Sequence, residues 1–149
     1  DKSYYKHLEE TSTDVIDDNT PISLIYSTAD ELCNDYIQAM LDSNYYFIGI
    51  HTVNPTTTST SLDVGQKIWD TIKIEEVKII KSKVRDSKAF YELEINVTDP
   101  GTSAFGEGKN PRWLYLASVK KGDVIHWYVE GLMSGGEPDE NWWNVIQGG

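Results

Sequence analysis

The chain has 149 residues, of which 24 are Asp or Glu and 13 are Lys or Arg, so its formal charge is −11 at pH 7. So acidic a protein repels phosphate backbones and anionic lipid headgroups, which argues against binding to nucleic acid or to a membrane surface. The length indicates one domain, and the single cysteine excludes an internal disulfide.

The first 22 residues are polar and acidic and have no sustained period, so we expect a flexible tail over residues 1–22 and one folded domain over residues 23–149. No initiator Met precedes Asp1. This suggests that a secretory signal, a lipid-anchor segment or another domain was removed upstream.

An amphipathic helix is predicted from about residue 28 to residue 42. Thr28 and Glu31 have the spacing of a capping box, and apolar residues from Leu32 to Leu41 recur at helical spacing. Cys33 lies on the apolar stripe, where a lone cysteine acts as a small buried hydrophobe rather than as a nucleophile.

The next stretch is less regular. Residues 45–50 (YYFIGI) suit a short strand or a packed continuation of the helix, and residues 51–61 (HTVNPTTTSTS) suit a loop. Asp63 is a candidate cap for a brief helix from Val64 to Trp69.

From Thr71 the apolar period changes to two, which predicts at least four strands joined by short turns. The apolar phase slips by one residue at Glu75 and Glu76, as a β-bulge would cause. The predicted strands lie at about 72–85, 90–98, 113–119 and 124–133, with turns at 86–87 and 121–123. Since the third is apolar on both faces, we expect it to be central.

A locally basic strip interrupts the acidic sequence, because residues 67–88 hold seven of the 13 bases. These bases alternate with Ile and Val, which favours the solvated face of an edge strand guarded by lysine over an anion site. The bases are Lys67, Lys73, Lys78, Lys81, Lys83, Arg85 and Lys88.

A helix followed by consecutive strands predicts an α+β fold with a meandering antiparallel sheet. A bulged sheet bends, and the one long helix must cover its apolar face. We therefore expect a curved, cone-like sheet wrapped around the N-terminal helix, with a pocket at its open end.

The element order, the bulged strand and the last strand, HWYVEGLMSGG with Trp127, Val129, Gly131 and Gly135, resemble the nuclear-transport-factor-two-like superfamily of cone-shaped domains. The resemblance spans about residues 24–134 and is greatest to lipoprotein-like domains of Gram-positive bacteria. It implies an extracytoplasmic location, secreted or lipid-anchored, with membrane contact only through a removed anchor. The chain departs from the superfamily in showing one clear N-terminal helix rather than two or three.

One candidate catalytic set lies on the last strand. His126, Tyr128 and Glu130 are two residues apart and so project from one face. An imidazole, a phenol and a carboxylate in one row suit proton abstraction next to a carbonyl. The favoured alternative is a polar, cross-strand-paired face.

Aromatic side chains supply the candidate ligand-binding residues, which are Tyr91, Trp113, Tyr115 and Trp127. They could line the pocket and stack against a ring, although such residues are more often core. Trp142 and Trp143 follow an acidic loop, and we favour their packing over the sheet above an exposed binding platform.

No cofactor or metal is expected. Cys33 and the three histidines lack zinc spacing, and residues 137–140 lack the pattern of a calcium loop. The favoured function is a non-catalytic binding module for a small molecule or a protein partner. The alternatives are a cofactor-independent isomerase, dehydratase or cyclase, and a homodimer formed through the sheet face.

Overall fold

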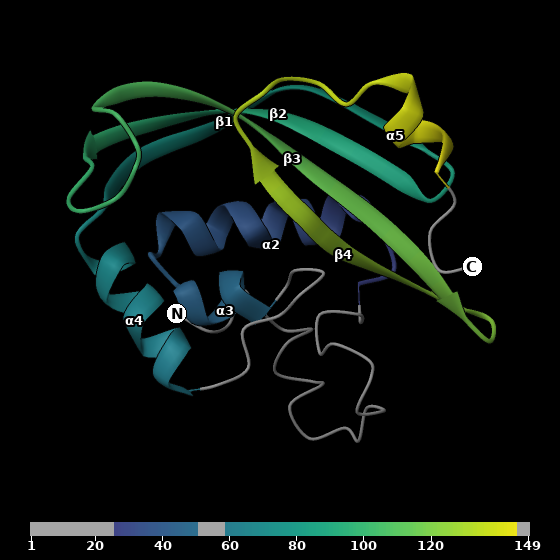
Figure 1. The fold of residues 1–149 in the computed structure, drawn as a ribbon, viewed down its shortest axis with the longest axis horizontal. Helices are drawn as coiled ribbons and strands as arrows, with labels where there is room; N and C mark the ends of the chain where they lie inside the picture. Colours follow the sequence, from purple (N-terminus) through teal and green to yellow (C-terminus); the bar gives the residue numbers. More distant parts are fainter. Residues whose placement is uncertain (1–25, 51–58, 146–149) are drawn as a thin grey trace.

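The computed structural model describes residues 26–50 and 59–145. Helices α2 (Ala29–Leu41), α3 (Tyr45–Ile50) and α4 (Ser59–Asp70) precede strands β1 (Lys73–Arg85), β2 (Lys88–Asp99), β3 (Gly108–Lys121) and β4 (Val124–Met133), and α5 (Glu140–Asn144) follows them. Within the described residues, the strands form one antiparallel sheet in the order β1-β2-β3-β4. The sheet curves over α2, and α5 lies on its other side (Figure 1). The predicted α+β fold is confirmed, whereas the expected tail over residues 1–22 lies outside the described residues.

Helix α2 forms where the sequence predicts it. The Thr28 hydroxyl accepts a hydrogen bond from the Glu31 amide at 3.2 Å, which satisfies one of the free N–H groups of the first turn. The buried side chains recur on one face and pack against the sheet and α3. They are Ala29, Leu32, Cys33, Tyr36, Ala39 and Met40.

The junction after α2 shows why residues 45–50 form a helix rather than a strand. Ser43 adopts φ 54°, the amide of Ser43 donates to the Met40 carbonyl at 3.2 Å, and the amide of Asn44 donates to the Ala39 carbonyl at 2.8 Å. These two bonds form a Schellman motif that ends α2. The Asn44 side chain then accepts from the Phe47 amide at 3.2 Å and caps α3.

The predicted start of the next helix is wrong. Helix α4 begins at Ser59, so Asp63 lies inside it and its carboxylate accepts a hydrogen bond from the Tyr46 hydroxyl. Residues 51–58 of the predicted loop lie outside the described residues. None of the helices in the described ranges is both long and apolar enough to span a bilayer.

Strand β1 is an irregular edge strand. The pairing with β2 shifts between Ile74 and Glu76, which confirms the predicted bulge, and it shifts again between Ile79 and Lys81. Most of the strand is exposed, so its lysines protect an open edge from pairing with another chain. The predicted exposed edge strand is therefore confirmed for β1, whereas Lys88, from the same basic strip, is buried at the start of β2.

Strand β3 is central, as predicted, but begins at Gly108 instead of Trp113. Pro111 is tolerated because β4 pairs with β3 only from Trp113 onward, which leaves residues 108–112 as a local edge. The earlier start places Arg112 on the sheet.

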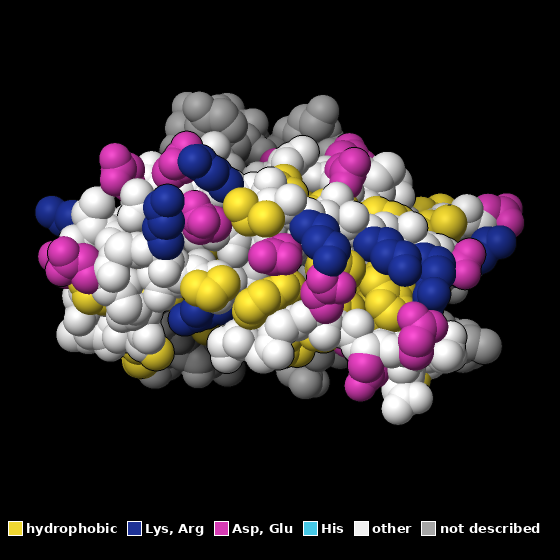
Figure 2. Space-filling view, turned by 90° about the horizontal axis from the view of Figure 1, so that it is seen from above, with side chains coloured by type: hydrophobic (Ala, Val, Ile, Leu, Met, Phe, Trp, Pro, Cys, Tyr) yellow, Lys and Arg dark blue, Asp and Glu magenta, His cyan; other side chains and the backbone are white. Residues whose placement is uncertain are grey.

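The alternation of side chains gives the sheet two different faces. Leu93, Leu114 and Val129 are buried on the concave face against α2, together with Tyr26, whose carbonyl accepts from the Trp127 amide at 2.8 Å. The opposite, convex face mixes charged and apolar side chains (Figure 2). Helix α5 packs on the convex face through Trp142 and Trp143.

Candidate functional site

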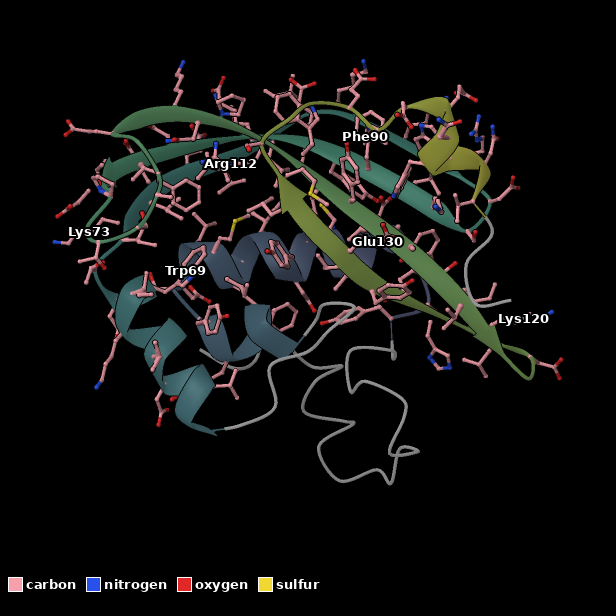
Figure 3. All side chains as sticks on the ribbon, viewed as in Figure 1. Trp69, Lys73, Phe90, Arg112, Lys120 and Glu130 are labelled. Carbon is pink, nitrogen blue, oxygen red and sulfur yellow. The ribbon has the colours of Figure 1, made fainter. Side chains whose placement is uncertain are left out.

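A cavity of about 330 Å3 lies between the end of α4 and the loop that joins β2 to β3. Its walls are mainly apolar, and Trp69 and Phe105 meet edge to face with ring centroids 6.2 Å apart. Its lining residues are Ile68, Trp69, Ile72, Thr102, Ser103, Ala104, Phe105 and Arg112. The cavity lies at one end of the curved sheet, with Trp69 on α4 and Arg112 on β3 (Figure 3).

The loop that carries Phe105 is held by hydrogen bonds from within the sheet. The buried Asn110 side chain accepts from the Gly106 amide at 2.9 Å and donates to the Gly106 and Gly108 carbonyls at 2.8 and 3.0 Å. The Ser103 hydroxyl donates to the Pro100 carbonyl at 2.7 Å and accepts from the Phe105 amide at 3.2 Å. One wall of the cavity is thus preformed.

The opposite wall is fixed to this loop through Thr71. The Thr71 hydroxyl donates to the Ile68 carbonyl at 2.6 Å and accepts from the Thr102 amide at 3.0 Å. Gly101 packs directly on Thr71, and a Cβ atom on Gly101 would lie 2.3 Å from the Thr71 carbonyl oxygen. The end of α4 and the loop therefore form one unit.

Arg112 supplies the only charge among the described residues that line the cavity. Its guanidinium lies 5.0 Å from the centre of the Phe105 ring, and Nη1 donates to the Pro111 carbonyl at 2.8 Å. No carboxylate in the described ranges forms an ion pair with it. An arginine positioned on an aromatic ring and lacking an acidic partner can bind a planar anionic group with two parallel hydrogen bonds.

The four predicted ligand-binding aromatics are not brought together. Tyr91 and Trp127 are buried in the core on the concave face, and the Tyr91 hydroxyl donates to Asp30. By strand register Trp113 and Tyr115 lie on the convex face, where Tyr115 donates to the Gly136 carbonyl at 2.7 Å. None of the four is among the described residues that line the cavity, so their ligand-binding role stays a prediction.

The predicted catalytic row is also on the convex face. His126 and Tyr128 alternate with the core residues Trp127 and Val129, and a register shift places Glu130 in a bulge opposite β3. The Glu130 carboxylate accepts from the Trp142 indole at 2.8 Å. Burial, and then the negative charge of Glu130, raise the pKa of Tyr128. The row lies away from the cavity, and its catalytic role stays a prediction.

The residues that form the cavity were not singled out from the sequence. Arg112 carries the clearest signal, because it shares a face with Leu114 and Leu116 and is a charge at the end of an apolar row. In the sequence, Trp69 stands out only as the end of a predicted helix, and Phe105 falls in a glycine-rich stretch with no predicted helix or strand. Their meeting depends on contacts between segments more than 30 residues apart.

No protein-family model, no curated protein and no solved structure matches this chain. Among the described residues, no group of three or more His, Cys, Asp and Glu side chains is placed to hold a metal ion.

Proposed function

We propose that this protein is a non-catalytic module that binds a small molecule with an apolar ring and an anionic group. The ring would lie against Trp69 and Phe105, and the anion would pair with Arg112. The observation that carries the proposal is the Arg112 guanidinium, which forms no ion pair with a described carboxylate and supplies the only charge among the described residues of a mainly apolar cavity, in a protein whose net charge is −11.

The chemistry of the lining favours binding over catalysis. A guanidinium stays protonated at all ordinary pH values, so it can orient and neutralise an anion but cannot transfer a proton. The described lining holds no Asp, Glu, His, Cys or Lys to act as acid, base or nucleophile. The superfamily resemblance and the extracytoplasmic location stay predictions.

The proposal is tested with a pair of matched probes, 2-naphthoate and its neutral analogue 2-naphthamide, titrated into 15N-labelled protein. We expect both to shift the backbone amides of residues 68–72 and 102–105, and naphthoate to bind more tightly. In Arg112→Gln the naphthoate affinity should fall about tenfold or more, as expected for loss of a charge-assisted hydrogen bond. Naphthamide affinity should change less than about twofold.

Lys109→Gln is the matched control, because Lys109 is on the same strand, lies near Glu94 and is not among the lining residues. It removes the same charge and should leave the binding of both probes unchanged. Amide-shift changes confined to other parts of the chain would contradict the proposed site. Equal losses of naphthoate affinity in Arg112→Gln and Lys109→Gln would contradict it as well.

A further inference from the structure

The C-terminal segment, defined here as residues 137–145, lies on the convex face of the sheet (Figure 1). It is joined to β4 through Gly135 and Gly136, and Gly136 has φ 112°. The five-residue α5 has no buried residue. A helix this short does not persist alone, so its conformation depends on the surface beneath it.

That surface combines cations with aromatic rings. The Arg85 guanidinium lies 4.7 Å from the Trp143 ring centre, and the Lys88 ammonium lies 4.4 Å from the Trp142 ring centre. Lys88 and Phe90 are each only 1% exposed, and both contact the C-terminal segment. The surface, here called the convex dock, consists of Lys81, Lys83, Arg85, Lys88, Phe90, Tyr115 and Glu130.

Polar contacts fix the position of the segment on the dock. Lys88 donates to the Trp142 carbonyl, and the Trp142 indole donates to Glu130 at 2.8 Å. Glu137 pairs with Lys81, and Glu140 lies 3.6 Å from Arg85. The ring of Tyr115 packs at 5.0 Å from that of Trp142.

The charges of segment and dock are complementary. The segment carries three acids, Glu137, Asp139 and Glu140, with two adjacent tryptophans. The dock carries four cations and one acid, which makes it a basic area on an acidic protein. Figure 2 shows Lys and Arg side chains close to apolar ones on this face. Such a surface selects acidic peptides and, through cation–π contacts, aromatic ones.

We infer that the convex dock is a docking site for an acidic, tryptophan-bearing segment of a partner protein, and that residues 137–145 occupy it as a built-in competitor. A tethered occupant acts at an effective concentration in the millimolar range. A partner segment therefore binds well only when it adds contacts of its own or when the tethered segment is released.

The test uses the full chain and a fluorescently labelled peptide with the sequence of residues 137–145, EPDENWWNV. The double variant Trp142→Ala/Trp143→Ala releases the tethered segment and should bind the peptide at least tenfold more tightly than the wild-type chain does. A peptide with alanine at both tryptophan positions should not bind. Binding should weaken as salt rises, because charge attraction contributes to it.

A second variant, Glu137→Lys/Glu140→Lys, also releases the segment, because it keeps both tryptophans but replaces two attractive ion pairs by repulsive ones. The two variants that release the segment are called the opened variants. The second keeps the experiment decisive if the first does not fold, and the dispersion of the amide spectrum reports folding in both. Adding Lys83→Gln/Arg85→Gln to an opened variant should abolish the tighter binding. Adding Lys73→Gln/Lys109→Gln, which removes the same charge outside the dock, should not.

Three outcomes would overturn the inference. The first is a folded opened variant that does not bind the peptide, and the second is wild-type protein that binds it as tightly as the opened variants do. The third is a concentration-dependent dimer of the wild-type chain in sedimentation that the double tryptophan variant loses. That result would assign the dock to a second copy of this chain.

Discussion

At the scale of single residues, the cavity depends on one close approach between chain segments. Gly101 has φ 54°, and its missing side chain allows the loop after β2 to lie against Thr71 at the end of α4. Thr71 and Asn110 then satisfy the backbone groups of that loop. The position of Phe105 beside Trp69 follows from these contacts.

We predict that Gly101→Ala destabilises the protein more than Gly122→Ala does. Both glycines have a positive φ, 54° and 62°, but a Cβ atom would meet Thr71 at Gly101 and nothing within 4 Å at Gly122. Gly122→Ala should cost only the backbone strain, about 1–2 kcal/mol. Gly101→Ala should cost roughly 1–3 kcal/mol more, as overpacking does.

Urea unfolding followed by circular dichroism measures both free energies. Binding of 2-naphthoate should also weaken in the Gly101→Ala protein that remains folded, because the loop carrying Phe105 must move. Equal free-energy losses in the two variants would show that the approach to Thr71 is not tight.

At the scale of elements, local hydrogen bonds decide where each helix starts and ends. Thr28 caps α2, and Ser43 ends it with a left-handed backbone conformation. Asn44 caps α3 directly afterwards. The Gln66 side chain then joins α4 to this junction, since it accepts from the Tyr45 amide at 2.8 Å and donates to the Ser43 carbonyl. The three helices are thereby held as one layer under the sheet.

We predict that Thr28→Ala lowers the free energy of unfolding by about 1 kcal/mol, the usual cost of losing an N-cap. Ser27→Ala is the neighbouring control, because its exposed hydroxyl donates to the Glu31 side chain and caps none of the described backbone amides. It should change stability by less than about 0.5 kcal/mol. Thermal unfolding of both variants checks this, and a loss of equal size would contradict the capping role.

At the scale of the whole molecule, the sheet separates two layers with different chemistry. The concave side holds the apolar core and α2, and the convex side holds the dock and α5. Buried tyrosines lie on both sides, and burial raises the pKa of Tyr36, Tyr91, Tyr115 and Tyr128.

These shifts predict a loss of stability in alkaline solution. An unfolded tyrosine loses its proton near pH 10, whereas a buried one keeps it, so the unfolded state binds fewer protons above that pH. The contribution of each tyrosine is complete below pH 10 and is lost as pH rises toward the raised folded-state pKa. Urea midpoints should therefore fall between pH 9 and pH 11.

The double variant Tyr36→Phe/Tyr91→Phe should show a shallower decline, because it removes two of these groups from the core. Tyr46→Phe is the comparison variant: Tyr46 is exposed, and its hydrogen bond to Asp63 raises its pKa, so its loss should flatten the decline less than the loss of the two core tyrosines does. An unchanged pH dependence in the double variant would mean that other groups, such as lysines, cause the decline.

The fold could be predicted from the sequence in most of its parts because its signals are local. Capping residues and helical spacing located α2, and the period-two pattern located β1, β2 and β4. The bulge near Glu75 was visible as a slip in that pattern. Two starts were predicted wrongly: α4 begins at Ser59, before Asp63, and β3 begins at Gly108, where its first residues are placed by pairing with the distant end of β2.

The cavity and the convex dock were harder to predict from the sequence than the fold was. Trp142 and Trp143 were correctly expected to pack over the sheet, but their cationic partners were not identified. Lys88 belongs by sequence to an exposed basic strip, yet it is buried beneath Trp142. Whether such a side chain is exposed or buried depends on the segment that packs over it.

By itself the sequence determined the class of fold, the helical and strand periods, the edge-strand character of β1 and the acidic charge of the chain. All of these depend on residue type and on spacings of a few positions, which a linear pattern records. Tertiary structure alone decided which side chains share the cavity, that Arg112 faces it with no acidic partner among the described residues, and that α5 covers the basic dock. These features arise from contacts between segments 30 to 60 residues apart, whose distances depend on sheet curvature and bulges rather than on any local pattern.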